Sequence, residues 1–198
     1  MESVAADGLV PTDNTVRERK LLFQVLFINF FFFALEIWMG FISNSMGLVA
    51  DSLDMLADSL VYGLALFAIG GTMAKKKNVA RASGYFQLLL AVFGMLEVVR
   101  RFLGFEEVPL FQTMIIISTL ALLGNATSLF LLQRSKSKEA HMQASMIFTS
   151  NDVIINLGVI IAGVLVFITG SKVPDLIMGA IVFVIVARGA YRILQISK

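Results

Sequence analysis

Three aspartates lie within one long apolar segment of the chain, at positions Asp51, Asp54 and Asp58. Their separation by three and then four residues places the three carboxylates on one face of a helix. An ionised side chain at the centre of a membrane-spanning helix costs roughly 2.5–3.5 kcal/mol on insertion scales. Three such residues in one segment therefore indicate binding of a cation, a proton or both.

Asp54 and Asp58 are the first candidates for cation ligands. Residues four apart on a helix have Cβ atoms about 5–6 Å apart, so both carboxylates can reach one ion. A structural role in hydrogen bonding between helices is the alternative. Asp51 lies nearer the outer end of its segment, where it is either a further ligand, a hydrated side chain, a helix cap or part of an access path.

A fourth carboxylate, Asp152, lies in another apolar segment. Ser145, Thr149, Asp152 and Asn156 recur at helical spacing and share one face. If this face meets the three aspartates, Asp152 completes a site of three or four oxygens, with Asn156 as a weaker candidate ligand. Asn151 points about 100° away from Asp152. We therefore expect it to pack against a neighbouring helix and keep it only as a weaker metal candidate.

Other polar residues in apolar segments are weaker candidates for the site. Glu36 and Asn125 either support the ligands or hold helices together. Glu97 lies one turn before Arg100 and Arg101, and this spacing favours a salt bridge near the outer surface.

The elements that must position these side chains are membrane-spanning helices. Hydrophobic residues make up 58% of the 198 residues, which excludes an ordinary soluble domain. A helix needs about 20 apolar residues to cross a bilayer. The six segments that qualify are Leu21–Ser43, Met46–Thr72, Ala82–Leu103, Phe111–Gln133, Ala144–Thr169 and Val173–Leu194. We predict an all-α integral membrane protein, with a polar segment over 1–20 and a six-helix transmembrane domain over 21–198.

The basic residues predict the orientation of these helices. All but three of the 16 Lys and Arg residues fall in the N-terminal segment, the second and fourth connections and the C-terminal end. Since Lys and Arg in short loops favour the cytoplasm, both termini are expected there. Basic residues confined to membrane loops do not indicate nucleic-acid binding. The chain has no cysteine, which excludes disulfides and thiolate metal sites.

Several motifs resemble the cation diffusion facilitator family. NSMGLVADSLDMLAD is similar to the family's first loop and second helix, where His or Asp precedes Asp by four residues, here Asp54 and Asp58. SNDVIINLGVIIAG resembles the fifth helix around its metal-binding Asp, here Asp152. RASGYFQ, MLEVVRRFLGFEEVP and VPDLIMGAIVFVIVARGAYRIL resemble the third helix, the loop after it and the sixth helix. The resemblance runs from about Ile28 to Ile196 and implies a membrane transporter of divalent metal ions.

Two departures from the family pattern affect these expectations. Phe148 stands where the family usually has a His ligand, so the site is richer in oxygen. Zn²⁺ remains the first expectation, and Mn²⁺, Co²⁺, Cd²⁺ or Fe²⁺ becomes more plausible. The chain stops at Lys198, without the soluble C-terminal domain common in the family, so a homodimer is expected to form through the membrane helices.

The function expected from these features is export of a divalent cation from the cytoplasm in exchange for protons, because both compete for the same carboxylates. No prosthetic cofactor is implied. The alternatives are transport of another cation and a non-transporting membrane subunit. An enzyme is not expected, since the glycine-flanked Asp motif of intramembrane aspartyl proteases is missing. The absence of an organelle-targeting segment favours a prokaryotic inner (plasma) membrane.

Overall fold

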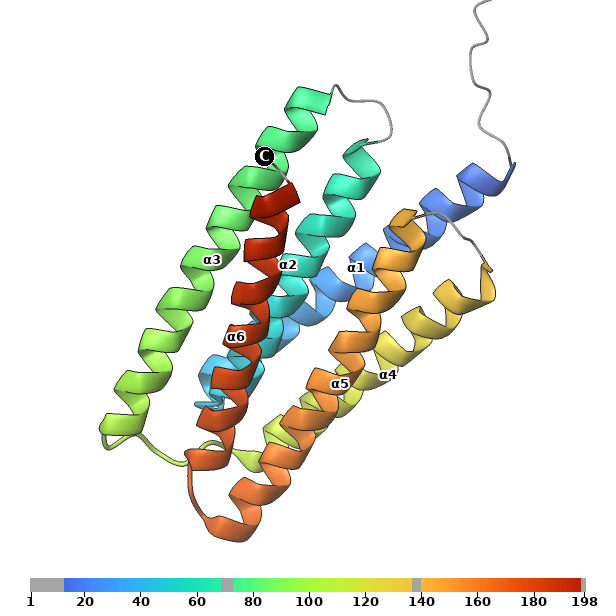
Figure 1. Cartoon of the computed structure of the whole chain (residues 1–198). Coiled ribbons are helices and arrows are strands. Elements are labelled where there is room, and N and C mark those ends of the chain that lie inside the picture. The colour runs from blue at the N-terminus through green and yellow to red at the C-terminus, as the bar shows by residue number, and fades with distance from the viewer. Residues whose placement is uncertain (1–12, 69–72, 137–139, 197–198) are drawn as a thin grey trace, which may run out of the picture.

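Six long helices make up the computed structural model, which describes residues 13–68, 73–136 and 140–196 (Figure 1). The helices are α1 (Asp13–Ile42), α2 (Met46–Ala68), α3 (Met73–Leu103), α4 (Phe111–Arg134), α5 (Ala140–Thr169) and α6 (Val173–Ile196). No strand occurs in these ranges. The predicted all-α fold with six helices is therefore confirmed.

Five of the helices, α1 and α3 to α6, contain a stretch long and apolar enough to cross a membrane. Helix α2 is of similar length, but it carries the three aspartates Asp51, Asp54 and Asp58. We treat it as the sixth span because it packs against the other five helices and lies inside the bundle. Many large apolar side chains, among them Phe27 and Trp38, are exposed on the outside of the bundle, as expected for a surface in contact with lipid.

Three helices begin earlier than their predicted spans. Helix α1 begins at Asp13, α3 at Met73 and α5 at Ala140. The added residues of α1 and α3 include Arg, Lys and Glu, which are good helix formers but are not apolar. Hydropathy detects the part of a helix that lies in lipid, so it misses a helical extension into water.

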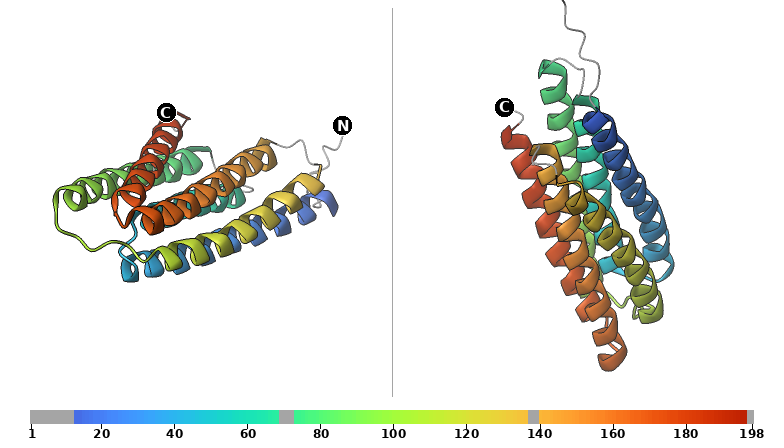
Figure 2. Two further views of the ribbon diagram at one scale, coloured as in Figure 1. Left: turned by 90° about the horizontal axis from the view of Figure 1, so that it is seen from below. Right: turned by 90° about the vertical axis from the view of Figure 1, so that its right-hand side faces the viewer.

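The helices pack as antiparallel neighbours (Figure 2). Helix α1 lies along α2, α4 along α5, and α3 along α6. Contacts of α1 with α4 and of α2 with α5 join these four helices into one bundle. Helices α3 and α6 both pack against α2. Helix α2 is thus placed where its side chains meet both α5 and α6.

The two ends of the bundle differ in charge. Helices α1, α3 and α5 begin, and α2, α4 and α6 finish, at one end (Figure 1), which we call the basic end. Its described basic residues are Arg17, Arg19, Lys20, Lys77, Arg81, Arg134, Lys136, Arg188 and Arg192. The opposite end has Arg100, Arg101 and Lys172. The fold therefore gathers the basic residues on one side, as the predicted topology requires.

Apolar packing closes the half of the bundle near the opposite end. Leu48, Val159, Leu176 and Val182 belong to one buried cluster that joins α2, α5 and α6. Helices α3 and α6 also approach closely there, because a Cβ on Gly94 would lie 2.2 Å from the ring of Phe183. Apolar contacts thus join α2, α5 and α6 in this half of the bundle.

The start of α2 is held by a carboxylate from α6. Asp175 accepts hydrogen bonds from Ser45 Oγ at 2.6 Å, from the Met46 amide at 2.7 Å and from the Gly47 amide at 2.9 Å. Ser45 Oγ in turn accepts from the amide of Leu48 at 3.1 Å. The amide donors of the first turn of α2, which have no partner within the helix, are thereby satisfied, and α2 is joined to α6.

Candidate metal-ion site

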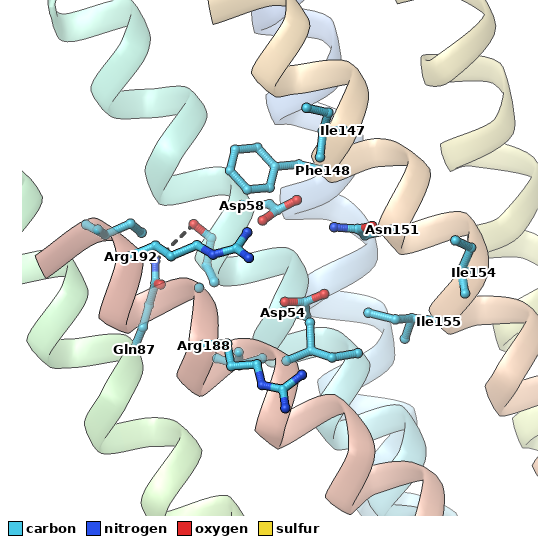
Figure 3. A pocket seen from close by; sticks show the side chains of 15 residues that line it. Asp54, Asp58, Gln87, Ile147, Phe148, Asn151, Ile154, Ile155, Arg188 and Arg192 are labelled. Atoms are coloured by element: carbon cyan, nitrogen blue, oxygen red, sulfur yellow. Dashed lines mark hydrogen bonds between the residues drawn. The ribbon is translucent and has the colours of Figure 1, made fainter. Parts of the chain in front are cut away.

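A pocket of about 510 Å³ lies between α2, α5 and α6, with one side chain from α3 (Figure 3). Its lining residues are Asp54, Ala57, Asp58, Gln87, Ile147, Phe148, Asn151, Ile154, Ile155, Ile185, Val186, Arg188, Gly189, Arg192 and Ile193. These positions come from the middle of α2, the first half of α5 and the second half of α6. The pocket therefore extends from the centre of the bundle toward the basic end.

Asp54 and Asp58 are the acidic residues of this pocket. Their exposed fractions are 8% and 6%, and both carboxyl groups lie in the space between α2 and α5 (Figure 3). Successive turns of α2 thus present two oxygen-bearing groups to one cavity, which is the arrangement that their spacing predicts. Carboxylate oxygens at this depth suit a cation better than any neutral ligand.

Asp152 is not among the residues that line the pocket. The residue has no exposed surface, and neither carboxyl oxygen has a hydrogen-bond partner. It lies within electrostatic range of Asp58, Asp54 and Asp51. Within the described residues, no three Asp, Glu or His side chains surround one point closely enough to hold a metal ion. The three predicted ligands are therefore neighbours, but they are not arranged around one ion in this conformation.

Asn151 has a different environment from the one predicted. It is exposed and lines the pocket with Asp54 and Asp58, so the expectation that it packs against a neighbouring helix is wrong. The reason is that the pocket separates α5 from α6 at this level. The face of α5 beside Asp152 therefore borders open space, and the amide of Asn151 is available to an ion in the pocket.

Asp51 and Asn156 lie in the core and do not line the pocket. Both are fully buried, and Asn156 Nδ2 donates to Asp51 Oδ2 at 2.6 Å. Asn156 Oδ1 accepts from Asn125 Nδ2 at 3.0 Å. The hydrated or helix-capping alternatives for Asp51 are thus wrong, because α1 and α5 also cover this face of α2. Neither residue touches an ion that occupies the pocket in this conformation.

Phe148 lines the pocket and packs against Tyr62 of α2, which is buried and does not line it. Their rings meet edge to face with centroids 6.4 Å apart. The hydroxyl of Tyr62 donates to the Ser145 carbonyl at 3.3 Å or pairs with Thr149 Oγ1 at 3.1 Å. Phe148 thus fills the position beside Asp58 with an aromatic ring. Tyr62 was not among the predicted site residues, although it lies four residues after Asp58 on the same face of α2.

Three polar side chains on α3 and α6 also escaped the sequence analysis. Arg188 and Arg192 are exposed and reach toward the pocket from α6 (Figure 3). In the sequence their positive charge served only to predict the topology. Gln87 on α3 donates to the Ala57 carbonyl at 3.2 Å and holds α3 against α2. The spacing of the two arginines by four residues was the available signal that they share one face.

The remaining sequence expectations lie outside the pocket. Glu97 pairs with Arg100 at 2.7 Å and with Arg101 at 2.9 Å, so the predicted salt bridge is confirmed. Glu36 is fully buried on α1 within electrostatic range of Asp51 and Asp152.

Comparison with protein families gives an independent result. Residues 22–197 match the family model described as the cation efflux transmembrane domain. The match includes most of α1 and all of the other five helices, among them α2, α5 and α6, which form the pocket.

Proposed function

The chain belongs to the cation efflux family and is therefore a multi-pass membrane cation transporter; from this premise we propose that it exports a divalent metal ion in exchange for protons. The observation that carries the proposal is the pair Asp54 and Asp58, which project from successive turns of α2 into one pocket. The pocket reaches the basic end, which we take to face the cytoplasm because basic loops favour that side. A cytoplasmic ion thus has access to the two carboxylates.

Exchange follows from the chemistry of these ligands. A carboxylate oxygen binds either a proton or a metal ion, so arrival of the metal displaces protons and arrival of protons displaces the metal. Antiport also requires that the site opens to each side in turn. The apolar cluster of Leu48, Val159 and Leu176 closes the opposite end in this structure. We propose that closure of the basic end brings Asp152 toward Asp54 and Asp58 while the opposite end opens.

The donor set bears on the choice of metal. Asp54, Asp58, Asp152 and Asn151 offer oxygen atoms, and Phe148 supplies no donor. We propose that the transported ion is Zn²⁺ or a similar ion, with Mn²⁺, Co²⁺, Cd²⁺ and Fe²⁺ as competitors, because the oxygen donors present can bind each of these divalent ions. The predicted homodimer through the membrane helices and the prokaryotic inner membrane location stay predictions.

Transport by purified protein in liposomes tests the proposal. Each of the five ions is added with a pH-sensitive dye on the other side of the membrane, and metal uptake is measured together with proton movement. We expect coupled fluxes for the wild type, loss of at least 90% of the flux in D54N and D58N, and normal flux in E107Q. Glu107 is exposed at the opposite end and is the matched control. Full flux in both Asp variants, or uptake without proton movement, contradicts the proposal.

A further inference from the structure

A second group of buried polar residues lies beside the pocket and away from its mouth. Glu36 on α1, Asp51 on α2, Asn125 on α4 and Asn156 on α5 all have no exposed surface. We call these four residues the buried polar cluster. Asp51 lies about one helical turn nearer the opposite end than Asp54. The cluster is thus next to the proposed metal site but separate from the pocket.

Glu36 gives the clearest sign that the cluster takes a ligand. Neither carboxyl oxygen of this residue has a hydrogen-bond partner, although it is fully buried. The charges that act on it come from Asp51 and Asp152, which are also acidic. Burial of an ionised carboxylate without a positive or hydrogen-bonding partner costs several kcal/mol of folding free energy. The side chain is therefore placed where a cation would lower its energy.

The hydrogen bonds of the cluster leave further oxygens unpaired. Asn156 Nδ2 donates to Asp51 Oδ2 at 2.6 Å, which leaves Asp51 Oδ1 without a partner. Asn125 Nδ2 donates to Asn156 Oδ1 at 3.0 Å, which leaves Asn125 Oδ1 without a partner. Because these bonds use an amide nitrogen of each asparagine, they fix the orientation of both amides. Three helices then each present an acceptor oxygen in the same buried region.

We propose that Glu36, Asp51 and Asn125 form a second cation-binding position that takes a hard divalent ion. Two carboxylates balance a charge of +2, and a donor set of carboxylate and amide oxygens suits Ca²⁺ or Mn²⁺. Asp152 lies within electrostatic range of both this position and the pocket aspartates. If the chain exports its ion as proposed above, an ion that leaves the pocket toward the opposite end binds next at this position.

Equilibrium binding of Mn²⁺ to the full chain in detergent at pH 8 tests the inference, with bound ion measured by loss of the free Mn²⁺ signal in electron paramagnetic resonance. We expect two ions per chain for the wild type, one for D54N/D58N and one for E36Q. The triple variant E36Q/D54N/D58N is expected to bind at least tenfold more weakly than D54N/D58N. The control N29A removes another buried amide of α1 and should keep both ions.

Two results would overturn the inference. One is a single Mn²⁺ bound to the wild type that is lost in D54N/D58N, because the cluster then binds no ion of its own. The other is unchanged Mn²⁺ binding in the triple variant. If E36Q does not fold, as judged by gel filtration, N125A provides the same comparison with both carboxylates intact. Failure of the transport proposal is recognised separately, since it is defined by metal flux in D54N and D58N.

Discussion

Removal of the Asp175 carboxylate should destabilise the protein strongly, although the residue is far from the pocket. Asp175 is 1% exposed and accepts three hydrogen bonds, from Ser45 Oγ and from the amides of Met46 and Gly47, at 2.6–2.9 Å. A hydrogen bond to a charged group contributes about 1.5–3 kcal/mol to stability. Because the three bonds share one acceptor group, we expect D175A to lose about 4 kcal/mol, below the simple sum.

Thermal unfolding of the purified chain in detergent measures this effect. For a chain of this size, about 1 kcal/mol corresponds to roughly 2–4 °C in Tm, so D175A should unfold about 8–16 °C below the wild type. D175N keeps one acceptor oxygen and should show about half of this decrease. E106A removes a partly exposed ion pair with Arg100 and should leave Tm unchanged. A Tm of D175A within 2 °C of the wild type would refute the reasoning, because it corresponds to a loss of only about 1 kcal/mol or less in the free energy of unfolding.

Three further predictions follow from the packing and the pocket. G94A should lower Tm, because the added Cβ would lie 2.2 Å from the Phe183 ring and overpacking costs about 1–3 kcal/mol of stability. The double variant G94A/F183L should recover most of the lost stability. An unchanged Tm in G94A would contradict the close contact. F148H adds a nitrogen donor beside Asp58 and should raise the ratio of Zn²⁺ affinity to Mn²⁺ affinity at least tenfold, as measured by competition binding. Equal changes in the affinities for both ions would argue against residue 148 as a ligand position. Metal affinity of the wild type should fall as pH is lowered from 8 to 6, because protons compete for the carboxylates; calorimetry that shows pH-independent binding contradicts proton exchange.

Much of the fold could be predicted from the sequence because the determining patterns are local. Six apolar segments separated by polar residues specify six helices, and the clustering of Lys and Arg anticipates that the described basic residues gather mainly at one end of the bundle. The spacing of Asp54 and Asp58 specifies that they share a helix face, and the structure places both in one pocket. Glu97 finds Arg100 and Arg101 within one turn of the same helix, so this pair needed no knowledge of the tertiary fold.

The features that the sequence did not predict depend on how helices distant in sequence meet. The rotation of α5 about its axis decides whether Asn151 or Asp152 borders the pocket, and periodicity alone gives no such angle. Asp175 lies in the first turn of α6, but its carboxylate accepts from residues some 130 positions earlier, which its own helix does not reveal. Asp51 is buried because α1 and α5 cover it, and a polar residue near a helix end offers no sign of such cover.

The central claim is that an ion reaches Asp54 and Asp58 through a pocket open to the basic end. The chain contains no cysteine, so a single cysteine at the exposed pocket residue Ile147 can report access to a membrane-impermeant maleimide. We predict that I147C is labelled from the basic side, that Mn²⁺ slows this labelling at least fivefold, and that the protection is lost in the D54N/D58N background. Labelling only from the other side, or protection by Mn²⁺ that persists without the two carboxylates, would contradict the claim.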